Sequence, residues 1–237
     1  MKIFERFRKK TDTTTTDMLD IPTDLAEELL PAGSNFIDDL VSYFTATPEI
    51  TAAFFGFAYD QATRKHLLVL AIDHMGDEEA VQQLTWMIKS TYMSDTEIYY
   101  ASRHTNQDLV EYIRQHNAPF FSKGNPQLLQ QQIMKQWFDE PTYRQELIDT
   151  LQTYELFTLA HKVENSKDLM LATYKREEDD FIPLFSLPEM IGRSGMINVP
   201  DDRVLVKMTL RRILGGINPG QLFILNPSTP FEVTMKI

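Results

Sequence analysis

Acidic and imidazole side chains gather directly after the most apolar stretch of the first half of the chain. The apolar run 66–72 is followed by Asp73, His74 and Asp77, and two glutamates come next. Carboxylates and imidazoles bind divalent metals, and in α/β proteins ligand sites often lie at the carboxyl ends of strands. Asp73, His74 and Asp77 are therefore candidate metal ligands, and a metal-dependent hydrolase is one interpretation of the sequence.

A structural interpretation of the same residues competes with the metal site. Asp77, Glu78 and Glu79 stand where a helix is expected to begin, and the positive end of the helix dipole stabilises acidic groups there. Turns between strands and helices also favour these residue types for backbone reasons. Because a metal cage needs several convergent ligands, we favour the structural interpretation and predict neither a metal nor a cofactor.

Other groups able to do chemistry lack a catalytic spacing. The acidic run 177–180 is expected to be an exposed turn, and the chain has no cysteine. The histidines at 66, 104, 116 and 161 are scattered, and no common hydrolase or metalloprotease motif is present. The glycines fit neither a dinucleotide-binding nor a P-loop pattern and are expected in turns: Gly192, Gly195, Gly215, Gly216 and Gly220. We therefore predict no catalytic residue and expect a protein that is not an enzyme.

Helical and extended patterns alternate along the first half of the chain. The spacing predicts helices over 23–47, strands over 52–59 and 66–72, a helix through Ile88, a strand over 97–101 and a helix opened by a capping box at Thr105. The strand 66–72 is apolar on both faces, which predicts a central strand covered on both sides. This order indicates helices layered over a small sheet.

The second half has a similar character. The segment 123–126 is the best domain boundary, because a glycine and an Asn-Pro pair separate two periodic segments there. Beyond it, we predict helices over 127–138, 141–153 and 210–214, and strands over 156–161, 169–174, 181–185, 204–208, 221–225 and 231–237. The predicted fold class is α+β, with two small domains that each have a mixed or antiparallel sheet covered by helices, over residues 23–122 and 123–237.

Residues 1–22 form a basic head followed by a threonine-rich linker. If the head is helical, Ile3, Phe4 and Phe7 lie on one side, which is the pattern of an interfacial helix. Weak membrane contact through these residues, as a peripheral adaptor, is therefore an alternative role. With so few apolar anchors, we favour a frayed, solubilising terminus.

The charge distribution narrows the range of partners. The net charge of −11 divides into +4 over residues 1–10, −13 over 11–122 and −2 over 123–237. Because neither folded half is net basic, we do not expect a nucleic-acid partner. No apolar run reaches the roughly 18 residues of a membrane span, and no secretory signal is recognised, so a cytoplasmic location is the expectation.

Short motifs in both halves resemble the bacterial SseB ("enhanced serine sensitivity") family. Residues 24–122 are similar to its C-terminal domain through the strand 66–73, Gly76-Asp77 and the ending 119–121. Residues 150–237 are similar to its N-terminal domain through 181–189, 204–214 and the run 222–227, which ends in Asn-Pro. The resemblance implies two α+β domains in an order reversed from that of the usual family, and it supplies no catalytic residue.

Together these observations favour a non-catalytic interaction or regulatory protein with a protein partner. Loops held by a rigid sheet are the usual seat of binding. The candidate binding residues lie on two such loops: Pro183, Phe185, Ser186, Pro188, Glu189, Asn226, Pro227 and Phe231.

Overall fold

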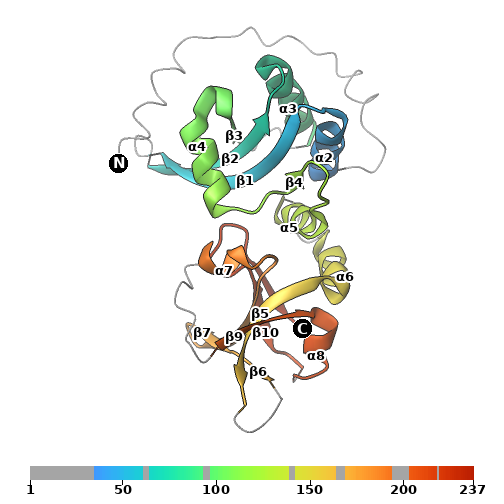
Figure 1. Cartoon of the computed structure of the whole chain (residues 1–237), viewed down its shortest axis with the longest axis vertical. Coiled ribbons are helices and arrows are strands. Elements are labelled where there is room, and N and C mark those ends of the chain that lie inside the picture. The colour runs from blue at the N-terminus through green and yellow to red at the C-terminus, as the bar shows by residue number, and fades with distance from the viewer. Residues whose placement is uncertain are drawn as a thin grey trace. The chain divides into compact units, whose positions relative to one another are not determined.

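A computed structural model describes residues 35–60, 64–92, 97–138, 142–163, 169–193, 203–217 and 219–237 (Figure 1). The chain divides into two compact units, one of Met1–Gln115 with Pro119–Pro126 and the other of His116–Ala118 with Gln127–Ile237. The basic head, the threonine-rich linker and the predicted helix that starts near residue 23 lie outside the described residues.

The first unit is built on a four-stranded mixed sheet. Its strands are β1 (Ile50–Asp60), β2 (Lys65–His74), β3 (Ile98–Ser102) and β4 (Phe121–Ser122), in the order β3-β2-β1-β4. The strand β2 pairs antiparallel with β1 and parallel with β3, and its residues from Leu68 onward are buried. The prediction of a central strand covered on both sides is confirmed.

Three described helices cover the two faces of this sheet: α2 (Phe36–Ala46), α3 (Glu78–Tyr92) and α4 (Arg103–His116). On one face, Leu109 and Ile113 of α4 pack with Val69 and other buried strand residues. On the other face, Phe36 of α2 contacts Phe55 of β1, with ring centroids 6.0 Å apart. The sheet is therefore a middle layer between helices, as expected from its apolar strands.

The start of α4 differs from the predicted capping box. Asn106 has a non-helical backbone, with φ −160° and ψ 73°, so the helix is kinked there. The hydroxyl of Ser102 accepts hydrogen bonds from the backbone N–H groups of His104 and Thr105, and Asn106 Oδ1 accepts one from Leu109. The prediction that Thr105 caps the helix is wrong, because Thr105 Oγ1 accepts from the N–H of Ser102 instead.

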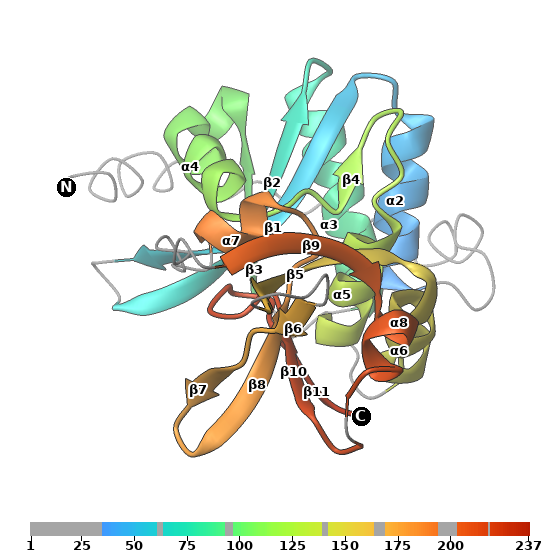
Figure 2. The same ribbon diagram turned by 60° about the horizontal axis from the view of Figure 1, so that its bottom comes forward.

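The second unit has two sheets and four short helices in the part of the chain that the structure describes. The helices are α5 (Leu128–Phe138), α6 (Arg144–Thr153), α7 (Glu189–Arg193) and α8 (Leu210–Leu214). One sheet has the order β6-β5-β9, with β5 (Glu155–Lys162), β6 (Leu169–Leu171) and β9 (Arg203–Thr209). The other has the order β11-β10-β8-β7, with β7 (Tyr174–Arg176), β8 (Asp179–Leu184), β10 (Leu222–Leu225) and β11 (Val233–Lys236). Figure 2 shows the β7–β8 hairpin with β10 and β11 beside it.

The two sheets of this unit are joined by main-chain contacts. The N–H of Phe157 donates to the carbonyl of Phe185 at 2.9 Å, and the reverse bond is 2.8 Å long. The predicted single strand 169–174 is two strands, since β6 pairs with β5 and β7 pairs with β8. The chain changes sheets at Ala172, which is fully buried and donates its N–H to Leu159.

The observed fold is α+β with mixed and antiparallel sheets, as predicted. Helix α7 was not predicted from the sequence. None of the helices in the described residues combines the length and the apolar character needed to cross a membrane.

Candidate functional site

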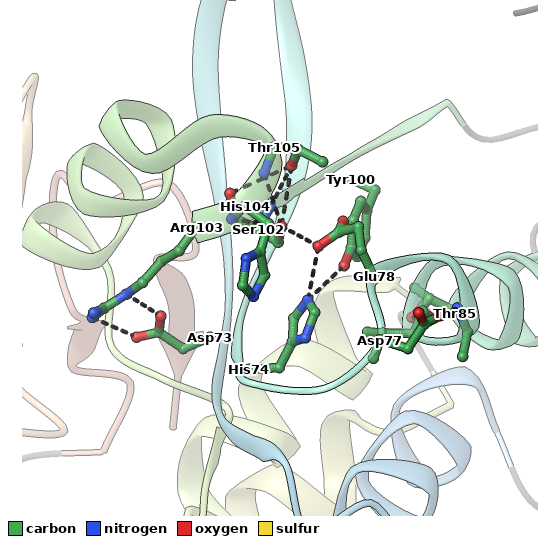
Figure 3. A network of polar contacts seen from close by, with 12 residues as sticks. Asp73, His74, Asp77, Glu78, Thr85, Tyr100, Ser102, Arg103, His104 and Thr105 are labelled. Carbon is green, nitrogen blue, oxygen red and sulfur yellow. Dashed lines mark hydrogen bonds and ion pairs between the residues drawn. The ribbon is translucent and has the colours of Figure 1, made fainter.

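The carboxyl end of β2 carries a cluster of polar side chains from neighbouring elements (Figure 3). His74 ends β2, Glu78 begins α3 and His104 lies in the first turn of α4. The side chain of His74 is fully buried, and its Nε2 lies 3.1 Å from Glu78 Oε2 and 3.2 Å from the hydroxyl oxygen of Tyr100. The ring centroids of His74 and His104 are 5.1 Å apart. His104, which the sequence left isolated, therefore joins this cluster.

The pairing of β2 with β3 explains why these side chains meet. Ile72 of β2 stands opposite Ser102 of β3 in a parallel pair. Because the carboxyl ends of parallel strands reach the same edge of a sheet, the residues after each strand become neighbours. The sequence contained one signal of this, since His74 and His104 both stand at the carboxyl ends of predicted strands, but the signal needs the parallel pairing to be known.

Two of the three candidate metal ligands have other partners. The carboxylate of Asp73 forms a two-bond ion pair with Arg103, one bond of which, from Nη2 to Oδ2, is 3.0 Å long. In Figure 3 the Asp73 side chain points to Arg103 and away from His74. Asp77 Oδ1 accepts the backbone N–H of Ala80 at 2.8 Å, which is a helix-capping bond. The helix-start role expected for Asp77 is confirmed, and His74 alone of the three joins the cluster.

Ser102 has the contacts of a helix cap. Its hydroxyl donates to Glu78 Oε2 at 2.6 Å and accepts from the N–H groups of His104 and Thr105. These bonds use the hydrogen and the lone pairs of the hydroxyl, and its proton faces a carboxylate rather than an imidazole. This geometry stabilises the start of α4 and does not match that of an activated nucleophile.

Tyr100 lines the same cluster from β3. Burial, together with the negative charge of Glu78, raises the pKa of Tyr100 well above its usual value. The phenol therefore stays protonated at neutral pH and serves as a hydrogen-bond donor. Beside it, Phe36, Thr85 and Trp86 line a hollow with room for about one water molecule, which is too small for an organic substrate.

The structure places the candidate binding residues of the second unit mainly in its interior. Phe185, Ser186 and Asn226 are each no more than 2% exposed. Asn226 Oδ1 accepts the N–H of Ser186 at 2.9 Å, and Gln130 Nε2 donates to Ser186 Oγ at 2.5 Å. The three polar side chains thus form one buried network that connects α5, the end of β8 and the end of β10.

The remaining candidates divide between the interior and the surface. Pro183, Pro227 and Phe231 are buried, and the carbonyl of Pro183 accepts the hydroxyl of Thr158 at 2.7 Å. Pro188 and Glu189, at the start of α7, are exposed. A partner can therefore contact Pro188 and Glu189 directly, while the buried candidates hold the loops in place through their packing.

Comparison with known families gives one match. Residues 28–123 match the family model described as the SseB protein C-terminal domain. The first unit is similar to the SseB C-terminal domain. The comparisons with curated proteins and with solved structures gave no match.

The SseB match covers residues 28–123, within the unit that carries the His74 cluster. The similarity of the second unit to the SseB N-terminal domain, and the reversed order of the two domains, stay predictions from the sequence.

Proposed function

We propose that the protein is a non-catalytic interaction or regulatory protein of the SseB type that binds a protein partner in the cytoplasm. The structural contacts of Asp73, Asp77 and Ser102 support a non-catalytic role, because each is already engaged in an ion pair or a helix cap. The hollow beside Tyr100 also lacks room for a substrate.

The observation that carries the proposal is an exposed apolar surface on the sheet β6-β5-β9. Leu169, Met170 and Leu205 are 45%, 60% and 45% exposed. Met170 stands opposite His161 and Leu205 stands opposite Leu159, so both flank the same face of β5. We call Met170 and Leu205 the β6–β9 surface; Leu169, the neighbour of Met170 in β6, points to the other face of the sheet. Large apolar side chains gathered at the surface mark protein contact sites.

The strands that carry this surface favour an extended partner. In the sheet as described, β6 and β9 are the outer strands, and β9 is seven residues long. An outer strand pairs with an added strand through its main chain, while side-chain contacts supply specificity. Arg203 stands opposite His161 and therefore lies on the same face of the sheet as Met170 and Leu205, whereas Lys162 lies on the other face with Leu169. We therefore expect an extended segment with apolar and acidic side chains.

The experiment is affinity capture with the full chain from a native cytoplasmic extract, followed by affinity measurements with the purified partner. Met170→Asp and Leu205→Asp change exposed side chains, so the fold is retained. We expect each to weaken binding at least tenfold, because an apolar contact is replaced by a charge that repels an acidic partner.

Leu128→Asp is the matched control, because Leu128 is 59% exposed in the same unit and lies outside the sheet. It should bind like the wild type. A captured partner that binds all three variants with equal affinity would exclude the β6–β9 surface. Turnover of a metabolite by the pure protein, abolished by Ser102→Ala or Asp73→Asn, would exclude the non-catalytic role.

A further inference from the structure

Three potential metal ligands converge in the first unit from segments distant in sequence. One ligand atom each from His74, Glu78 and His104 lie within 4.8 Å of one another. Two imidazoles and a carboxylate are a ligand set that Zn²⁺ and related transition metals prefer. Such three-residue sets leave a fourth position for water.

The distances need only a small adjustment to fit an ion. Two ligands held at about 2.0–2.1 Å by a tetrahedral ion lie roughly 3.4 Å apart. His74 Nε2 lies 3.1 Å from Oε2, one of the two oxygens of the Glu78 carboxylate. His104 must approach by up to about 1.4 Å, and its exposed side chain can rotate to do so.

Two buried atoms of this cluster lack partners in the part of the chain that the structure describes. Glu78 Oε1 and His74 Nδ1 are both buried without a hydrogen bond. A buried polar atom without a partner destabilises the fold by about 1–3 kcal/mol. A cation bound to the Glu78 carboxylate would remove this penalty at Oε1, while Ser102 holds Oε2 in position at 2.6 Å.

We propose that His74, Glu78 and His104 bind one divalent transition-metal ion of the Zn²⁺ class. The ion would connect the end of β2, the first residue of α3 and the first turn of α4, which stands just before the kink at Asn106. This site differs from the ligand set suggested by the sequence, because Asp73 and Asp77 are replaced by Glu78 and His104. Ion binding at this place goes beyond the proposed partner binding and does not depend on it.

The test measures Zn²⁺ binding to the full chain after treatment with a chelator, by calorimetry and by thermal unfolding. We expect one ion per chain and a higher Tm with Zn²⁺, because a ligand that binds the native state stabilises it. His104→Ala removes an exposed ligand without disturbing the core, and it should weaken Zn²⁺ binding at least tenfold and abolish the Tm increase. Co²⁺ provides a second readout, through the visible absorption of a four-coordinate ion.

His66→Ala is the matched control, since His66 is an exposed histidine of β2 that lies outside the cluster. It should bind Zn²⁺ like the wild type. The proposal is overturned if Zn²⁺ leaves the wild-type Tm unchanged, or if His104→Ala and the wild type bind Zn²⁺ equally. Neither outcome affects partner binding, because the β6–β9 surface belongs to the other unit.

Discussion

Asn226 shows how a residue of the recognised Asn-Pro motif stabilises the fold. Its φ of 49° lies in the left-handed region, which asparagine tolerates better than most residues. Its backbone N–H donates to the carbonyl of Leu184 at 2.7 Å, and its side chain binds Ser186. The Asn-Pro pair therefore ends β10 and fixes the loop after β8, which gives the motif a structural purpose.

Asn226→Ala should reduce the free energy of unfolding by about 2–4 kcal/mol, from the lost buried hydrogen bonds and the left-handed backbone. Chemical denaturation checks this. Asn226→Gly separates the two causes, because glycine adopts a positive φ without a penalty. We expect it to be more stable than the alanine variant by about 1 kcal/mol. Equal stability of the two variants would contradict the assigned backbone strain.

Ser102 offers a second test at single-residue scale. Ser102→Ala removes the hydroxyl that caps the start of α4, and it should reduce the free energy of unfolding by about 1 kcal/mol. Ser90→Ala in α3 is the control, because Ser90 is exposed and its hydroxyl donates a hydrogen bond to the carbonyl of Trp86 in the same helix. A Ser102→Ala variant as stable as Ser90→Ala would contradict the capping role.

At the scale of elements, an ion pair connects β7 to the loop before β11. Arg176 binds Glu232 through two hydrogen bonds, and the N–H of Ser228 also donates to Glu232 at 2.8 Å. Burial acts to raise the pKa of Glu232, but the hydrogen bonds from Arg176 and Ser228 outweigh it and lower the pKa below its usual value. The pair therefore stabilises the fold while the carboxylate is ionised.

Glu232→Gln should reduce the free energy of unfolding by about 1 kcal/mol at pH 7. A carboxylate with a lowered folded-state pKa contributes its full stability above its unfolded-state value, about 4.3, and loses it as the pH falls through the folded-state value. The difference between wild type and variant should therefore shrink below about pH 4. Chemical denaturation of both proteins at several pH values measures this difference in the free energy of unfolding.

Glu155→Gln is the control for this pair, because Glu155 and Lys207 form an ion pair with both side chains more than half exposed. Its effect should be near zero, since solvent screens exposed pairs. A Glu232→Gln difference that persists unchanged at pH 3 would contradict the assigned pKa.

The sequence predicted elements well where the signal is local. The short helix 210–214 and the buried strand 66–72 follow from periodicity and from turn residues, and both were found. Features that depend on distant partners were missed. The strand breaks at Ala172 because the residues before it pair with β5 and the residues after it pair with β8, in the other sheet. His104 comes close to His74 only because β2 and β3 pair in parallel.

The candidate binding loops also depend on contacts with distant residues, which the sequence did not predict. Phe185 and Asn226 stand next to strand ends, where sequence reasoning expects exposed recognition residues. The main-chain contact of Phe157 with Phe185 turns this loop inward, and α7 covers it with Met190. The direction in which a loop folds depends on the other sheet, which the residues of the loop do not encode.

At the scale of the whole molecule, the chain passes between its two units in an unusual way. Residues 116–118 belong to the second unit, while the next eight residues return to the first and supply β4. Ala118 packs against the core cluster of Leu159, Phe185 and Met190. A single cut therefore cannot separate the units cleanly.

This crossing predicts how fragments of the second unit behave. Each unit has its own buried core, so we expect fragment 127–237 to unfold cooperatively when it is expressed alone. Fragment 116–237 regains Ala118 and should be more stable by up to about 1 kcal/mol, because the methyl group of Ala118 is partly buried against the second core. Ala118→Gly in the longer fragment should remove this gain, because it deletes only that methyl group and loosens the backbone. Equal denaturation midpoints for the two fragments would mean that residues 116–118 lie against the second core without stabilising it.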